Sequence, residues 1–219
     1  MVAWPSIYSR KLWEYDVALA LEAVNEMGFN EINFDYIRMP EWLPSSIETH
    51  NKYNETPSQC ATEFLRYAVE QIHNAGAYVS GDVFGEISGY RTSECTVFVS
   101  GYGQFWPAIS NAVDVISSMP YPDHFSAYSF GVAEPWEEPG ELMSSWAKAT
   151  SLAQSVTYDA AKVRTWIQAQ SSDTYEVEYG ADKIEAQIQA LDAQNFDGYM
   201  TWNAASSLYR YRLYAGVLN

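Results

Sequence analysis

Residues 28–40 read GFNEINFDYIRMP, and this stretch decides the interpretation of the fold. Within it, Glu31-Ile32-Asn33-Phe34-Asp35-Tyr36 alternates polar and apolar side chains, which is typical of a β-strand with two different faces. Gly28 stands where a glycine commonly ends a helix, and Pro40 stops the strand on the other side. We therefore expect a helix, a strand at 31–36 and a loop in direct succession.

The alternation of helix and strand continues along the rest of the chain. Helices are expected at 11–27, after an N-cap at Ser58, at about 140–155 and after an N-cap at Asp182. Further strands are expected at 78–84, 113–119, 163–168 and 198–203. Such alternation indicates parallel strands joined by helical crossovers. Long loops follow the strands at 41–57, 85–104 and 121–139, where the active-site loops of a (β/α)8 barrel lie.

The expected fold is α/β, of the (β/α)8 TIM-barrel type, formed as a single domain over residues 1–219. A closed barrel needs eight strands, and this chain supplies about five βα units. An open five-stranded parallel α/β sheet is therefore the alternative architecture.

Composition narrows the classes of function. The chain of 219 residues has 28 acidic and 12 basic side chains and a net charge of −16, which argues against nucleic acid as a partner. No run of 18 apolar residues is present, so no membrane span is expected. Aromatic residues reach 16%, more than a core requires, and we expect some to line a groove for a ligand with apolar faces and hydroxyls.

Motifs for metals and cofactors are missing from the sequence. Cys60 and Cys95 have no CxxC partner, which leaves one disulfide between them as an option and makes a zinc site an unfavourable interpretation. The patterns HxH, HExxH, GxSxG and the P-loop are also absent. We expect neither a metal nor a cofactor.

Two carboxylates stand at the ends of consecutive predicted strands. Asp35 is the last polar residue of the strand at 31–36, and Asp82 lies in the next strand. Neighbouring strands lie about 4.8 Å apart, so the two carboxylates could approach to roughly 5–7 Å. Such pairs cleave glycosidic bonds, one protonating the leaving oxygen while the other attacks the sugar or activates water. Either Asp could instead cap a helix or bind a loop amide, and Glu86 is a reserve acid.

Several motifs resemble a family of "putative glycosyl hydrolase" TIM-barrel domains. The resemblance is carried by GFNEINFDYIRMP at 28–40, by WEYD at 13–16 and ALEA at 20–23 before it, and by SGDVFG at 80–85, DVISSMPYPDH at 114–124, RTWIQ at 164–168 and GYMTWNA at 198–204. It implies a (β/α)8 barrel in which the visible strands are the fourth to the eighth. It also implies Asp35 and Asp82 as the catalytic positions.

Roles for the two carboxylates follow from their neighbours. Arg38 beside Asp35 would keep that carboxylate ionised, as a nucleophile or charge stabiliser needs. Asp82 next to apolar residues such as Phe84 would then be the acid, although the two roles could be exchanged.

Further side chains at predicted strand ends are candidates for binding a sugar. Aromatic rings stack on pyranose faces, and amides, hydroxyls and imidazoles read sugar hydroxyls. The candidates are Tyr36, Arg38, Tyr121, His124, Trp166, Gln168, Trp202 and Asn203. For each Trp the competing interpretation is core packing, and for Arg38 it is a structural ion pair.

The function we expect is hydrolysis of a glycosidic bond in a polysaccharide by the Asp35–Asp82 pair. One alternative is a non-catalytic carbohydrate-binding barrel. Another is a fragment or subunit that needs a partner chain, or a missing N-terminal segment, to complete the barrel. The acidity and aromatic content favour a secreted or cell-surface location.

Overall fold

The computed structural model describes residues 5–40, 51–88, 102–196 and 198–218. These residues form two compact units, and each is described by itself. Unit 1 holds the described residues within 1–83, 90–116 and 157–161, and unit 2 those within 84–89, 117–156 and 162–219. The expectation of a single domain stays a prediction.

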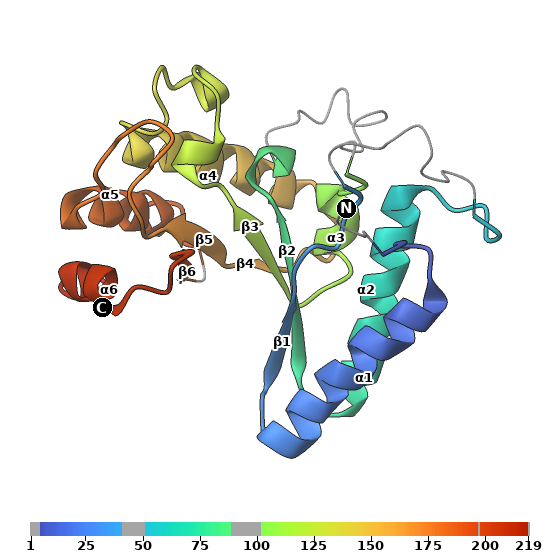
Figure 1. Cartoon of the computed structure of the whole chain (residues 1–219). Coiled ribbons are helices and arrows are strands. Elements are labelled where there is room, and N and C mark those ends of the chain that lie inside the picture. The colour runs from blue at the N-terminus through green and yellow to red at the C-terminus, as the bar shows by residue number, and fades with distance from the viewer. Residues whose placement is uncertain (1–4, 41–50, 89–101, 197, 219) are drawn as a thin grey trace. The chain divides into compact units, whose positions relative to one another are not determined.

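Unit 1 is built from helices and parallel strands that alternate along the chain. Its elements are α1 (Arg10–Met27), β1 (Glu31–Phe34), α2 (Pro57–Asn74), most of β2 (Tyr78–Phe84), α3 (Trp106–Ser110) and the first two residues of β3 (Val115–Met119). The boundary between the units falls after Val83 in β2 and after Ile116 in β3. Figure 1 shows α1 and α2 packed side by side. The core beneath them is made by apolar side chains such as Val17, Leu65, Ile72 and Val79, all nearly inaccessible to solvent.

The end of α1 at Gly28 was predicted, whereas its N-cap was not. Ser9 caps the helix by accepting a hydrogen bond from the Leu12 amide, and Gly28 ends it with a left-handed φ of 76°.

The start of α2 corrects a prediction. The N-cap is Thr56, whose hydroxyl accepts from the Gln59 amide while the Gln59 side chain accepts from the Thr56 amide. Pro57 fills the first helical position, where a missing amide hydrogen has no cost. Ser58 therefore lies inside the helix, where it is buried.

β1 and β2 are parallel neighbours, with Glu31 opposite Tyr78 and Phe34 opposite Gly81. The predicted strand at 31–36 is shorter in the structure because Tyr36 has a φ of 59°, which turns the chain out of the extended conformation.

Unit 2 contains the second half of the alternation. Its elements are η1 (Gly85–Ser88), the rest of β3, η3 (Pro122–His124), η4 (Ser129–Gly131), α4 (Pro139–Ser155), β4 (Lys162–Val163), β5 (Thr165–Gln168), α5 (Ala181–Asp192), β6 (Tyr199–Trp202) and α6 (Leu208–Tyr214). Helices α4 and α5 pack side by side (Figure 1). The N-cap of α5 is Gly180 rather than the predicted Asp182, which lies in the first turn and complements the helix dipole.

The described strands form two sheets, one of four strands in the order β1-β2-β3-β4 and one of two strands, β5 and β6. The predicted strand at 163–168 is thus divided, and the alternative of one open five-stranded sheet is wrong. Near this break, the Thr165 hydroxyl donates a hydrogen bond to the Ser118 carbonyl at 2.7 Å. β5 and β6 are parallel, with Gln168 opposite Trp202.

Buried side chains of α4 form much of the core of unit 2. Leu142, Met143 and Trp146 are inaccessible to solvent, and the Trp146 indole nitrogen donates to the Gly85 carbonyl at 2.9 Å. No described helix is both long enough and apolar enough to cross a membrane.

Candidate functional site

A ladder of side-chain hydrogen bonds joins the polar faces of β1 and β2. The Ser80 hydroxyl donates to Oε1 of Glu31 at 2.7 Å, and Nδ2 of Asn33 donates to Oδ2 of Asp82 at 3.0 Å. In the register, Glu31 lies opposite Tyr78 and Asn33 opposite Ser80. Each side chain of β1 therefore bonds to the residue two positions after the one that it lies opposite. Glu31 and Asn33, which the alternation placed on one face of the strand, thus both bond to side chains of β2.

Asp82 is held inside β2 rather than at its end. Its exposed fraction is 3%, and the amide of Gln104 donates to its backbone carbonyl at 3.2 Å. A buried carboxylate needs hydrogen-bond donors, because its transfer out of water is otherwise costly. Asn33 supplies one such donor from the neighbouring strand.

Asp35 lies directly after β1 and is exposed. Its Oδ1 accepts a hydrogen bond of 2.6 Å from the amide of Tyr36, the residue with positive φ. The carboxylate thus stabilises the turn that carries the chain away from the strand. The register of β1 and β2 ends at Phe34 opposite Gly81, and Asp35 and Asp82 are the residues that follow this pair in the two segments.

A pocket of about 350 Å³ lies in unit 1 beside the end of β1. Asp35, Tyr36 and Arg38 line it together with mainly apolar side chains of α1, β1 and α2, whereas Asp82 is not part of its lining. The Arg38 guanidinium lies 5.1 Å from the Tyr36 ring centre and 5.9 Å from that of Tyr102. The structure therefore brings three of the four site residues predicted in unit 1 into one pocket.

In unit 2, three of the predicted binding residues form an aromatic group. The rings of Tyr121 and Trp202 are stacked, with centres 4.6 Å apart and planes inclined by 22°. The His124 ring stands edge-on to both, at 5.2 Å from Tyr121 and 5.9 Å from Trp202. Tyr121 is buried and supports Trp202 from behind, while Trp202 is half-buried and His124 is exposed.

A buried carboxyl group that the sequence interpretation missed lies beside this aromatic group. The side chain of Asp123 is 10% exposed, and its Oδ1 is 3.7 Å from Nε2 of His124. Burial raises the pKa of Asp123, and the positive charge of His124 and hydrogen bonds from Ser172 and Gln168 offset only part of that effect. Its place two residues after Tyr121, in the loop that follows β3, was the one available signal.

The loops after β3 and β5 are joined around Asp123. Ser172 hydrogen-bonds the Asp123 side chain, and the hydroxyl of Tyr179 donates to the Trp136 carbonyl at 3.0 Å. The rings of Trp136 and Tyr175 are stacked with centres 3.7 Å apart. These contacts give the surroundings of Asp123 a defined geometry.

Two predicted sugar-reading amides are engaged within the protein. Gln168 is fully buried, its Oε1 accepting from the Asp123 amide and its Nε2 donating to the Gln170 carbonyl. Asn203 is 7% exposed and donates to the Ala169 carbonyl. Both amides hold loops together within the protein, and their role in reading a sugar hydroxyl stays a prediction.

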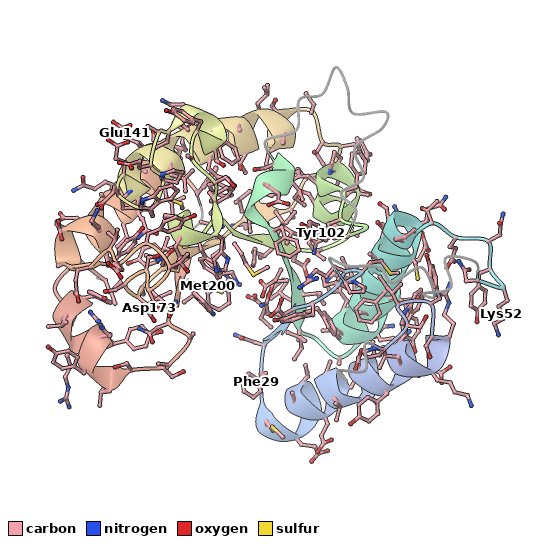
Figure 2. The ribbon with its side chains drawn as sticks, turned by 45° about the horizontal axis from the view of Figure 1, so that its top comes forward. Phe29, Lys52, Tyr102, Glu141, Asp173 and Met200 are labelled. Atoms are coloured by element: carbon pink, nitrogen blue, oxygen red, sulfur yellow. The ribbon has the colours of Figure 1, made fainter. Side chains whose placement is uncertain are left out.

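Trp166 shares a face of its sheet with Trp202. Side chains two residues apart in a strand point to the same face, and the register places Met200 (Figure 2) opposite Trp166 and Trp202 opposite Gln168. Trp166 is half-buried, and the reserve acid Glu86 lies in η1 and is also half-buried.

In the described part of the chain, no three His, Cys, Asp or Glu side chains are grouped as ligands of a metal ion. Cys60 is buried in unit 1, where its thiol donates to the Ile7 carbonyl, and burial raises the pKa of this thiol to about 11. Cys95, its expected disulfide partner, lies outside the described residues.

Parallel strands alternating with helices, with carboxylates and aromatic rings near their carboxyl ends, define the class of (β/α)-barrel domains that bind ligands at that end. The chain belongs to the family described as "Putative glycosyl hydrolase domain", whose model matches residues 1–209. No curated protein matched the chain in a sequence comparison.

Several solved structures are similar to this chain. The PgaB (BpsB) glycoside hydrolase domain of Bordetella bronchiseptica superimposes with a TM-score of 0.61 at 13% identity, over 97% of this chain and 63% of that one. The spore cortex-lytic enzyme SleL of Bacillus megaterium QM B1551 gives 0.60 at 10% identity, over 97% and 55%. A class V chitinase of Pseudomonas fluorescens Pf-5 gives 0.59 at 13% identity, over 97% and 74%.

These likenesses show the fold, which is that of glycoside hydrolase TIM-barrel domains. The chain spans 63% and 55% of the lengths of the first two, so it corresponds to part of such a barrel. The predicted family and the predicted partial barrel are thereby confirmed.

Proposed function

We propose that this protein hydrolyses a glycosidic bond in a polysaccharide, with Asp35 and Asp82 as its pair of carboxyl groups. The observation that carries the proposal is the parallel pairing of β1 and β2, which holds Asp82 within β2 and places Asp35 directly after β1. Two carboxyl groups on adjacent strands, about 4.8 Å apart, are the kind of pair that glycoside hydrolysis uses. Membership of a glycosyl hydrolase family supports this chemistry.

The environments of the two groups suggest their roles. Asp82 is 3% exposed, and because burial disfavours a charged carboxylate it suits the proton donor to the leaving glycosidic oxygen. Asp35 is exposed and accepts a hydrogen bond from the Tyr36 amide, which suits an ionised group. The Asp35 carboxylate would then attack the anomeric carbon, or remove a proton from the water that does so.

The test is a mass-spectrometric screen for oligosaccharides released from a panel of polysaccharides. We expect product from the wild type and a loss of rate of about 100-fold or more in Asp35→Asn and in Asp82→Asn, since each variant lacks one acid–base group. Glu14→Gln, which removes an exposed carboxylate of α1, is the matched control and should release product at the wild-type rate. Wild-type rates in both Asp variants would refute the assignment.

Chitin and other amino-sugar polysaccharides belong in the panel, because one of the similar structures is a chitinase. Such substrates lie outside the cytoplasm, and the acidic composition agrees with a secreted or cell-surface protein. Separate immunoblots of culture medium and cell fractions would test this location, and a signal confined to the cytosol would contradict it.

The stacked Tyr121 and Trp202 rings favour a second candidate function, carbohydrate binding without cleavage. In that case both Asp variants would bind glycans with wild-type affinity, and no panel member would yield a product from any variant. Isothermal titration of each variant distinguishes this outcome from hydrolysis.

A partner is also proposed for β1, which stands at the end of the strand order of its sheet. An unpaired strand edge is normally covered, and the similar structures are longer than this chain. We propose that β1 pairs with a strand from a partner chain or from a preceding segment. Light scattering tests this, and a stable monomer of 24.8 kDa would argue against an obligatory partner.

A further inference from the structure

The side chain of Asp123 in unit 2 has a buried carboxyl oxygen without a hydrogen-bond donor among the described residues. Its Oδ1 is inaccessible to solvent and makes no hydrogen bond within the described part of the chain. Nε2 of the His124 imidazole lies 3.7 Å from this oxygen. Burial of a carboxylate without a partner would cost free energy. We therefore take the His124 imidazole as the partner of this oxygen.

The protein holds this carboxyl group from the opposite side. The amide of Asp123 donates to Oε1 of Gln168 at 3.1 Å, and Ser172 hydrogen-bonds its side chain. Gln168 is fixed in turn by Gln187 of α5, which accepts from its amide at 3.0 Å and donates to its carbonyl at 3.1 Å. The position of the carboxyl group is therefore set by β5, α5 and the loop after β5.

His124 connects this buried group with the surface. Its side chain is 56% exposed, and its ring stands edge-on to Trp202. Nε2 faces Asp123, and the ring also contacts the rings of Tyr121 and Trp202. A nearby carboxylate favours the imidazole form that carries its proton on the facing nitrogen, which leaves the other nitrogen as an acceptor.

We propose that Asp123 is a positioning residue, which holds the His124 imidazole beside Trp202 so that Nδ1 accepts a hydrogen bond from a hydroxyl of a pyranose ring stacked on that indole. The proposal rests on the proposed function for the class of ligand. Trp202 supplies an apolar face, Tyr121 supports it from behind, and the imidazole supplies the polar contact that fixes the orientation of the sugar.

The first test reads the state of the ring in the ligand-free protein. Two-bond proton–nitrogen correlations distinguish the protonated from the unprotonated ring nitrogen of His124, which is assigned by its loss in His124→Gln. We expect Nε2 protonated and Nδ1 unprotonated in the wild type, and a larger fraction of the other tautomer in Asp123→Asn. Asp173→Asn, which alters an exposed carboxylate of the same loop region (Figure 2), is the control.

His73 is an internal control for the same spectra, because its Nε2 lies 2.8 Å from Asp114 in unit 1. Its signals should be identical in all variants. If the His124 nitrogen shifts in Asp123→Asn equal those in Asp173→Asn, the carboxylate does not orient the ring and the proposal fails.

The second test measures affinity by titration with chitohexaose, cellohexaose and the glycan that the wild type binds best in the panel. Removal of one net hydrogen bond predicts an affinity about fivefold weaker in Asp123→Asn and in His124→Gln, with Asp173→Asn unchanged. Asp123→Glu, which retains the charge, should recover part of the loss.

The outcomes separate this inference from the proposed function. Weaker binding and an altered tautomer in Asp123→Asn support the inference even if no glycan is cleaved. Unchanged affinity in His124→Gln, or the absence of glycan binding by the wild type, overturns the ligand part even if Asp35 and Asp82 prove essential for hydrolysis.

Discussion

At the scale of single residues, Asp82 depends on a donor from the neighbouring strand. Asn33→Ala removes the Nδ2 donor and leaves a nearly inaccessible carboxylate with one hydrogen bond fewer. We expect the free energy of unfolding to fall by about 1–2 kcal/mol, as is usual when a buried acceptor loses its donor. Urea unfolding measures this loss. Asn30→Ala, at an exposed position beside β1, should change stability much less, and equal losses would contradict the prediction.

The raised pKa of Asp123 predicts a pH dependence of stability. An unfolded Asp titrates near pH 4, at about 3.9, and burial places the folded value higher. Between the two values the folded protein binds more protons than the unfolded chain, so the free energy of unfolding falls as pH rises through this window. Asp123→Asn lacks this loss and should gain stability relative to the wild type from pH 4 to pH 7.

Urea titrations at several pH values between 4 and 7 check the sign of this effect. Asp173→Asn, which changes an exposed carboxylate, should run parallel to the wild type. If the free energies of unfolding of Asp123→Asn and the wild type differ by the same amount at every pH, Asp123 has the same pKa in the folded and unfolded protein, which contradicts the prediction.

Local patterns predicted some of these residues and missed others for a physical reason. The alternation of residues 31–34 is a property of neighbours in sequence, so it placed Asn33 on the polar face of its strand, the face on which its side chain bonds to Asp82. The burial of Asp123 depends on Ser172 and Gln168, which belong to another strand and its loop. No pattern around residue 123 contains that information.

At the scale of elements, the N-cap of α2 can be tested by substitution. Thr56→Ala removes the hydroxyl that accepts from the Gln59 amide and should cost about 1 kcal/mol of stability. Ser58→Ala is the matched control, because Ser58 was the N-cap expected from the sequence and lies inside the helix. Thermal unfolding of both variants decides between the two caps, and a larger loss in Ser58→Ala would reverse the assignment.

Elements with strong periodicity were predicted closely, and short ones were not. The helix at 11–27 and the strand at 78–84 match α1 and β2 because several apolar residues repeat on one face. The division of 163–168 depends on which strand each half pairs with, a choice made by distant residues. The helix at residues 106–110 is too short for periodicity to reveal.

At the scale of the whole molecule, the net charge of −16 acts on any charged polymer that approaches. Polyanionic glycans are repelled over a distance set by the ionic strength, about 30 Å at 0.01 M and about 10 Å at 0.1 M salt. Neutral polysaccharides do not experience this repulsion. The net charge therefore favours neutral over polyanionic substrates, whichever residues perform the chemistry.

This charge predicts a salt-dependent selectivity. At low ionic strength we expect the protein to bind neutral oligosaccharides in preference to polygalacturonate, because the polyuronate carries the same sign of charge. Raising the salt from about 0.01 M to about 0.1 M should increase affinity for the polyuronate severalfold and leave the neutral glycan nearly unaffected. Binding titrations at the two salt concentrations measure both affinities. Equal salt responses for the two polymers would show that selectivity arises from local contacts, since a long-range field must distinguish a charged chain from a neutral one.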